Sequence, residues 1–143
     1  MKIRPHAQVI ITKNGKLFCL QGKDGVRNEV FYRTPGGGID FGEYAKDAIA
    51  REMLEEFNAS IINIKQIGID ENIFVYEGKA GHEITFLFTA DFVDNSMHED
   101  KFYRILDSES GDGARWEPID LFLSGERALY PSSVLTYLTQ NTD

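Results

Sequence analysis

A glycine-rich segment, residues 34–43 (TPGGGIDFGE), runs directly into an amphipathic helical pattern that begins at Tyr44. Apolar side chains recur there at helical spacing, which predicts a helix with one buried side. That side comprises Ile49, Ala50, Met53, Leu54 and Phe57. Asn58 follows the last apolar residue and is predicted to end the helix in left-handed backbone. The glycine-rich loop therefore leads directly into an amphipathic helix, and its backbone lies beside that helix.

The opposite face of this helix carries Glu52, Glu55 and Glu56 within an arc of about 100°. In a partly desolvated cleft, two carboxylates about 4 Å apart repel by ~4 kcal/mol, so something must offset the charge or the side chains must splay into water. Glu43 precedes the helix, and Arg51 lies within it to neutralise or orient the acids. Clustered hard oxygen ligands suit Mg²⁺ or Mn²⁺, which bridge to substrate phosphates. We therefore predict that a divalent metal holds these acids together.

The rest of the chain alternates strand-like and helical segments. Asn14-Gly15 predicts a hairpin turn, and Gly68 interrupts a segment that is either one bent strand or two. Residues 93–113 are predicted to form a long polar loop, and Trp116 is predicted to be buried. The expected strands are 7–12, 16–21, 30–33, 61–77, 82–92 and a short one around Trp116, with a second helix at 131–140. This order indicates one α/β domain, residues 1–143, with a mixed sheet.

Net charge, cysteine content and hydropathy exclude several classes of protein and of partner. The formal charge of −8 argues against a nucleic-acid polymer as partner, although it allows a phosphate substrate that arrives with divalent metal. Cys19 is the only cysteine, which excludes an intrachain disulfide and a cysteine-rich zinc site. No apolar run approaches the length that spans a bilayer, and the N-terminal residues do not resemble a signal peptide. We therefore expect a cytoplasmic protein without membrane contact.

Residues 37–59, GGIDFGEYAKDAIAREMLEEFNA, resemble the Nudix box of the Nudix hydrolase superfamily, in its MutT-like form. In that motif, five residues separate a glycine from a glutamate. Seven more residues separate the glutamate from the run Arg-Glu-apolar-x-Glu-Glu-x-Gly-apolar. The matching positions are Gly37, Glu43, Arg51, Glu52, Met53, Glu55, Glu56 and Ala59. Asn58 stands where the family has its second glycine, and asparagine is the next best residue for left-handed backbone.

The resemblance implies a Nudix-type α/β/α sandwich with a mixed β-sheet. It also implies a divalent-metal-dependent hydrolase that cleaves a pyrophosphate bond in a nucleoside diphosphate linked to another moiety. Glu52 and Glu56 would be the main ligands of Mg²⁺ or Mn²⁺, with Glu55 and the Gly37 carbonyl assisting. Glu52 would also be the general base, held in place by Arg51 together with Glu43.

Several alternatives stay open in the sequence. Nudix enzymes often bring a further acid from the loop at 93–113, and its spacing from Trp116 favours Glu109, with Asp112 in reserve. Glu71, His82 and Glu83 are candidates to line the substrate pocket. A nucleotide-sensing module without catalysis is the competing class of function, although such modules typically lack box acids that this chain retains. Neither the particular small nucleotide-type substrate nor a homodimer can be decided from the sequence.

Overall fold

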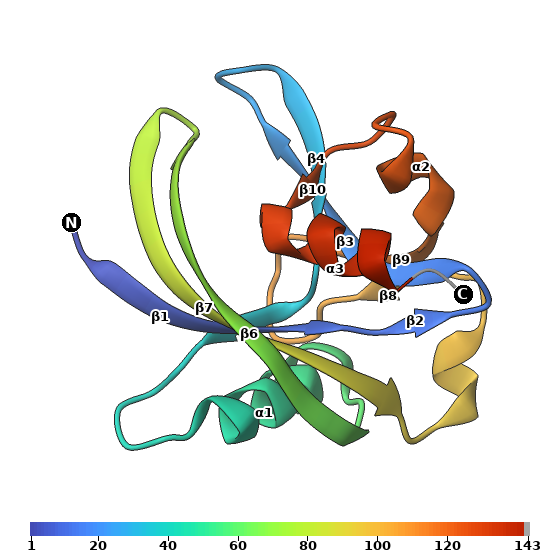
Figure 1. The fold of residues 1–143 in the computed structure, drawn as a ribbon. Helices are drawn as coiled ribbons and strands as arrows, with labels where there is room; N and C mark the ends of the chain where they lie inside the picture. The colour runs from blue at the N-terminus through green and yellow to red at the C-terminus, as the bar shows by residue number, and fades with distance from the viewer. Residues whose placement is uncertain (142–143) are drawn as a thin grey trace.

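A computed structural model describes residues 1–141 as two β-sheets with helices packed against them (Figure 1). The first sheet has the strand order β5-β1-β7-β6 and the second the order β10-β4-β3-β9-β8, with β2 paired to β3. The strands of the first sheet are β1 (Ile3–Ile10), β5 (Gly36–Gly38), β6 (Ile61–Tyr76) and β7 (Lys79–Phe92). Those of the second are β2 (Thr12–Lys13), β3 (Lys16–Asp24), β4 (Glu29–Arg33), β8 (Tyr103–Arg104), β9 (Gly113–Pro118) and β10 (Leu129–Tyr130).

Both sheets mix parallel and antiparallel pairs. β1 runs parallel to β7, and β10 runs parallel to β4, while the other neighbouring strands are antiparallel. The α/β class with mixed strands is thus confirmed, but the single sheet expected from the sequence is two. The chain leaves the first sheet after Ile10 and enters the second at Thr12, so the Asn14-Gly15 hairpin joins β2 to β3 only.

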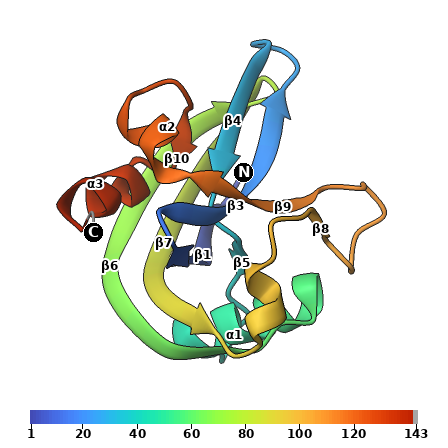
Figure 2. The ribbon, with the colours of Figure 1, turned by 90° about the vertical axis from the view of Figure 1, so that its right-hand side faces the viewer.

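Helices cover the first sheet from both sides, as Figures 1 and 2 show. Val9 packs in one core cluster with α1 (Ala45–Phe57), whereas its neighbour Ile10 packs in the other with α3 (Ser132–Gln140). Adjacent side chains of a strand point to opposite faces, so this partition places the two helices on opposite sides of β1. The result is the α/β/α layering that the resemblance implies.

Helix α1 buries a narrower apolar face than its sequence pattern suggests. Ile49, Met53 and Phe57 are buried as expected, Ala50 is half-buried, Leu54 is 50% exposed, and Ala48, which was not predicted, is buried. Glu56, expected on the polar side, is only 9% exposed. The predicted division into an apolar and a polar face is therefore wrong at Leu54 and Glu56. The reason is that the glycine loop and the residues after β8 also contact this helix.

The C-terminal end of α1 confirms the interpretation of Asn58. This residue has φ 52° and ψ 37°, and its backbone N–H donates to the Leu54 carbonyl. Left-handed backbone at a residue other than glycine is best tolerated by asparagine, whereas a β-branched side chain clashes there. The cap turns the chain toward β6 without interrupting the apolar packing of Phe57 and Ala59.

We expect Asn58→Gly to keep the free energy of unfolding within about 1 kcal/mol of the wild-type value, because glycine adopts the same backbone conformation. Asn58→Val should lower it by more than the glycine variant does, by about 1–3 kcal/mol. Denaturant unfolding of both variants measures the difference. Equal stability of the valine and glycine variants would show that the left-handed conformation carries no cost.

The second half of the chain holds more regular structure than expected. β6 is one long strand with two register shifts against β7, near Ile62–Lys65 and Gln66–Gly68. The predicted loop at 93–113 contains a short 3₁₀ helix, Asn95–His98, and strand β8. Trp116 is buried as predicted, and its indole N–H donates to the Met97 carbonyl. Helix α2 (Ile119–Leu123) was not foreseen. Among residues 1–141, the helices are too short or too polar to cross a membrane.

Candidate active site

The glycine loop is held directly against helix α1. Gly37 lies opposite Ala7 in the pairing of β5 with β1, and a Cβ atom at position 37 would overlap the Glu52 carboxylate. Gly36 has φ 154°, and a side chain there would overlap the Ala7 carbonyl. Glycine is therefore required at position 36, where a side chain would meet backbone, whereas a side chain at position 37 would displace the Glu52 carboxylate.

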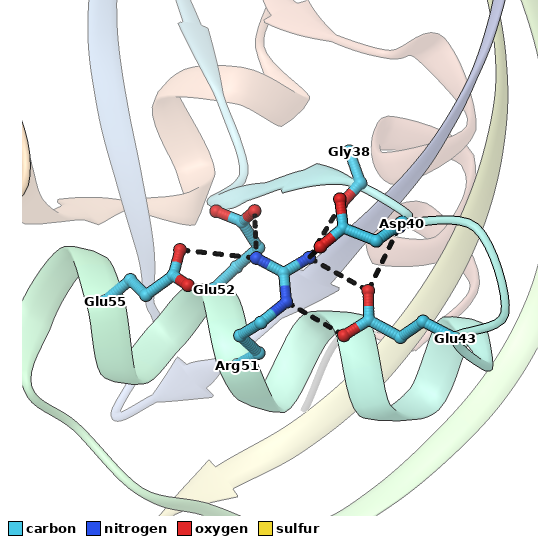
Figure 3. A network of polar contacts seen from close by, with 6 residues as sticks. All are labelled: Gly38, Asp40, Glu43, Arg51, Glu52 and Glu55. Atoms are coloured by element: carbon cyan, nitrogen blue, oxygen red, sulfur yellow. Dashed lines mark hydrogen bonds and ion pairs between the residues drawn. The ribbon is translucent and has the colours of Figure 1, made fainter.

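Arg51 is the centre of the polar network between the loop and the helix (Figure 3). Its Nε donates to Glu43 at 2.8 Å, and Nη1 donates to Glu52 at 3.0 Å and to Glu55 at 3.2 Å. Nη2 donates to the Gly38 carbonyl at 3.0 Å and to the second Glu43 oxygen at 2.9 Å. All three guanidinium nitrogens are thus engaged, and one cation gathers three of the four predicted acids.

The Arg51–Glu43 contact is two-pronged and fixes both side chains. Hydrogen bonds from Arg51 lower the pKa of Glu43 to about 2, and the same contact raises the pKa of Arg51. Glu43 is therefore a permanent anion near neutral pH and cannot exchange protons with a substrate there. Its two hydrogen bonds from Arg51 fix that guanidinium, and the roles expected of Glu43 and Arg51 in holding Glu52 stay predictions.

Glu52 and Glu56 lie deeper and have a different environment. Burial raises the pKa of Glu56 to about 8, with the neighbouring Glu52 charge adding to the shift. Burial also raises the pKa of Glu52, against the lowering effect of its hydrogen bond from Arg51. Within residues 1–141, Glu56 Oε1 is buried without a hydrogen-bond partner. A buried, unpartnered carboxylate oxygen is costly unless a cation or a proton meets it.

These residues fit a divalent metal, although their side chains are not already arranged as its ligands. In the described part of the chain, no group of three His, Cys, Asp or Glu side chains converges closely enough to hold an ion. The Arg51 guanidinium lies between Glu43, Glu52 and Glu55 and engages their oxygen atoms (Figure 3). The unpartnered oxygen of Glu56 and the hard carboxylate donors nevertheless match the preference of Mg²⁺ and Mn²⁺.

The loop after β8 brings a further acid to this cluster. The negative charge of Asp107 contributes to the raised pKa of both Glu52 and Glu56. The backbone N–H of the adjacent Leu106 donates to the Glu56 carbonyl, which joins this part of the loop to α1. Asp107 and Glu109 are both exposed, and the role expected of Glu109 stays a prediction.

The three pocket candidates on β6 and β7 separate into two sites. His82 contacts Glu71 at 2.7 Å, whereas Glu83 is buried and contacts Arg4 at 3.0 Å and His6 at 3.2 Å. His82 and Glu83 are consecutive in β7 and so point to opposite faces of the sheet. The pair of His82 with Glu71 and the group of Glu83 with its two partners therefore cannot line the same pocket.

Solved structures share this fold at low sequence identity. A NUDIX hydrolase from Nitrosomonas europaea has a TM-score of 0.68 at 19% identity, over 96% of this chain and 87% of that one. A MutT protein from Bacillus halodurans has a TM-score of 0.64 at 20% identity, over 94% and 80%. A MutT NUDIX hydrolase from Burkholderia pseudomallei has a TM-score of 0.57 at 17% identity, over 84% and 86%.

The layered mixed sheets, with a glycine loop leading into an acidic helix, define the fold class of the Nudix hydrolases. The sequence profile of the NUDIX domain matches residues 2–136, and this chain belongs to the NUDIX family. By class it is a Nudix pyrophosphohydrolase. Members of the family generally require a divalent cation and act on small nucleotide-type substrates.

Proposed function

We propose that this protein hydrolyses a pyrophosphate bond in a small nucleoside diphosphate derivative, such as a nucleotide, a nucleotide sugar or a dinucleoside polyphosphate. Mg²⁺ or Mn²⁺ would be held by Glu52 and Glu56, with Glu55 and the Gly37 carbonyl assisting. The observation that carries the proposal is the buried Glu56, with one oxygen unpartnered among residues 1–141, beside the half-buried Glu52, whose carboxylate lies against Gly37.

The roles of the chain's own residues follow from their environments. When bound, a divalent ion would supply positive charge against the substrate phosphates and would acidify the attacking water. Glu52 is the base, because burial has raised the pKa of its carboxyl and so favours proton uptake. Arg51, fixed by Glu43, holds Glu52 in place through its 3.0 Å contact. Attack at phosphorus then depends mainly on positioning and on stabilisation of charge.

The loop acid is open to a direct test. We expect Asp107→Asn to lower kcat about tenfold, because its charge reaches Glu52 and Glu56. Glu109→Gln, the substitution favoured by sequence spacing, is measured beside it, and Glu99→Gln in the outer part of the loop is the control. Steady-state kinetics of the three variants identify which acid contributes. Full activity in both Asp107→Asn and Glu109→Gln would show that the loop takes no part and would leave Glu52 as the base.

A nucleotide-sensing module is the alternative from another class of function. The retention of Glu43, Glu52, Glu55 and Glu56 supports catalysis over sensing. The deciding experiment incubates the purified protein with a panel of nucleotides, nucleotide sugars and dinucleoside polyphosphates and Mg²⁺, with phosphate or nucleotide release as the readout. Turnover of one class identifies the substrate, whereas tight binding without any turnover would favour the sensing module and contradict the proposal.

A further inference from the structure

Arg33 is a half-buried cation whose side chain has no acceptor in the described part of the chain. It is the last residue of β4, four positions before Gly37, and makes no side-chain hydrogen bond or ion pair with residues 1–141. By contrast, Arg4 is paired with Glu83, Arg127 with Glu117, and Arg51 with the acids of its network. A guanidinium held partly away from water with free donors is unusual in a protein of net charge −8.

Strand geometry shows which way Arg33 points. The preceding residue, Tyr32, packs its ring on Phe122 with 5.5 Å between centroids. Side chains alternate along a strand, so Arg33 points to the opposite face of β4. On that face it lies opposite Leu20, which belongs to the core cluster that includes the buried side of α1.

The neighbouring polar groups do not engage the Arg33 guanidinium. On β1 and β7, Glu83 is taken up by Arg4 at 3.0 Å and by His6 at 3.2 Å. On α1, Glu43, Glu52 and Glu55 are taken up by Arg51. Among residues 1–141, Arg33 thus faces the core side of β4 without an ion pair to either group.

Farther out on the same face of β4, an aromatic contact joins the two sheets. Phe31, on the Arg33 side of β4, packs against Tyr76 of β6 with 5.8 Å between ring centroids. The Tyr76 hydroxyl donates to the Lys23 carbonyl, and the Glu77 backbone N–H donates to Asp24, so the tips of the two hairpins are fastened together. Arg33 lies two residues from Phe31 on this face, at the end of β4 from which the chain enters the glycine loop against Glu52.

We propose that Arg33 binds a phosphate group of the substrate beside the acidic cluster. This inference rests on the proposed function, since it concerns a phosphate brought to that same site. The carboxylates there repel an anionic substrate, and the nitrogens of Arg51 are already engaged with Glu43, Glu52, Glu55 and the Gly38 carbonyl. The planar fork of a guanidinium matches two phosphate oxygens, and such charge-assisted pairs are among the stronger hydrogen bonds.

The test compares Arg33→Gln, Arg33→Lys and wild type in binding methylenediphosphonate, a pyrophosphate mimic that resists hydrolysis, with Mg²⁺ present. Isothermal titration should show a Kd about tenfold to a hundredfold weaker for Arg33→Gln. Arg33→Lys should bind with intermediate affinity, because it keeps the charge but not the fork. Thermal unfolding should differ little, since no intramolecular contact is lost. Arg115→Gln is the matched control: Arg115 is exposed over the Phe102 ring and should bind the probe as wild type does.

The outcomes separate this inference from the proposed function. Wild-type affinity and kcat/KM in Arg33→Gln, in a protein whose wild type turns over a nucleotide, would overturn the role of Arg33 alone. A wild type that neither binds the probe nor hydrolyses any nucleotide overturns both. If Arg33→Gln does not fold, Arg33→Lys decides: wild-type affinity in that variant contradicts a forked contact, and a several-fold weaker Kd supports it.

Discussion

Glu52→Gln is expected to lower kcat by about three orders of magnitude, as the loss of a general base and metal ligand would. Glutamine keeps the shape of the side chain that packs against Gly37 but can neither accept a proton nor carry a charge. The melting temperature should hold or rise, because burial and the neighbouring charges of Glu55 and Asp107 already disfavour an anion at this position. Kinetics on the substrate found in the panel, together with thermal unfolding, measure both effects.

Asp47→Asn is the matched control for Glu52→Gln. Asp47 lies in the first turn of the same helix, is exposed, and takes no part in the Arg51 network. Its replacement should leave kcat near the wild-type value, with a small loss of stability from the helix N-terminus. Near-normal turnover by Glu52→Gln would remove this residue from the reaction and would contradict the assignment of the acidic helix face.

Removal of divalent metal is expected to abolish activity, and restoring Mg²⁺ or Mn²⁺ should recover it. Ca²⁺ should support turnover poorly, because it prefers longer bonds and looser geometry than these small hard ions. The physical reason lies in the site: Glu52 and Glu55 place negative charge where anionic phosphates must approach, and Glu56 Oε1 has no partner among residues 1–141. Activity measured in excess chelator, then with each ion added back, gives the result.

A second readout keeps the metal test independent of catalysis. Binding of Mn²⁺ by the protein without nucleotide can be followed by titration, and Glu56→Gln should weaken it by at least tenfold if Glu56 is a ligand. Asp47→Asn again serves as the control. Full activity in excess chelator, or Mn²⁺ affinity that Glu56→Gln leaves unchanged, would contradict the proposed set of ligands.

Residues close together in the chain were predicted well because their interactions are local. The helical period between Tyr44 and Phe57, the left-handed backbone of Asn58 and the contact of Arg51 with Glu43 depend on separations of one to eight residues. Local spacing also identifies the loop and helix as a Nudix box, and the profile match to residues 2–136 confirms the family. No distant part of the chain is needed for these conclusions.

Positions that depend on distant packing were missed. Glu56 is buried and Leu54 exposed because the segments around β5 and β8 close over one side of α1, which the helical period alone does not reveal. The backbone hydrogen bond from Leu106 to the Glu56 carbonyl joins the loop to α1 next to Asp107, a contact that spacing from Trp116 along the chain does not reveal.

The amino-acid sequence by itself determined the family, the class of chemistry and the acidic helix face, since these follow from side-chain types at short spacing. Only the tertiary structure decided the burial of Glu56, the joining of the loop next to Asp107 to α1, and the absence of an acceptor for Arg33 among residues 1–141. Arg33 belongs to the second sheet, whereas Glu56 lies on a helix packed against the first. Charge and burial at such a junction depend on how distant segments pack, and a residue's neighbours in the chain carry little information about that.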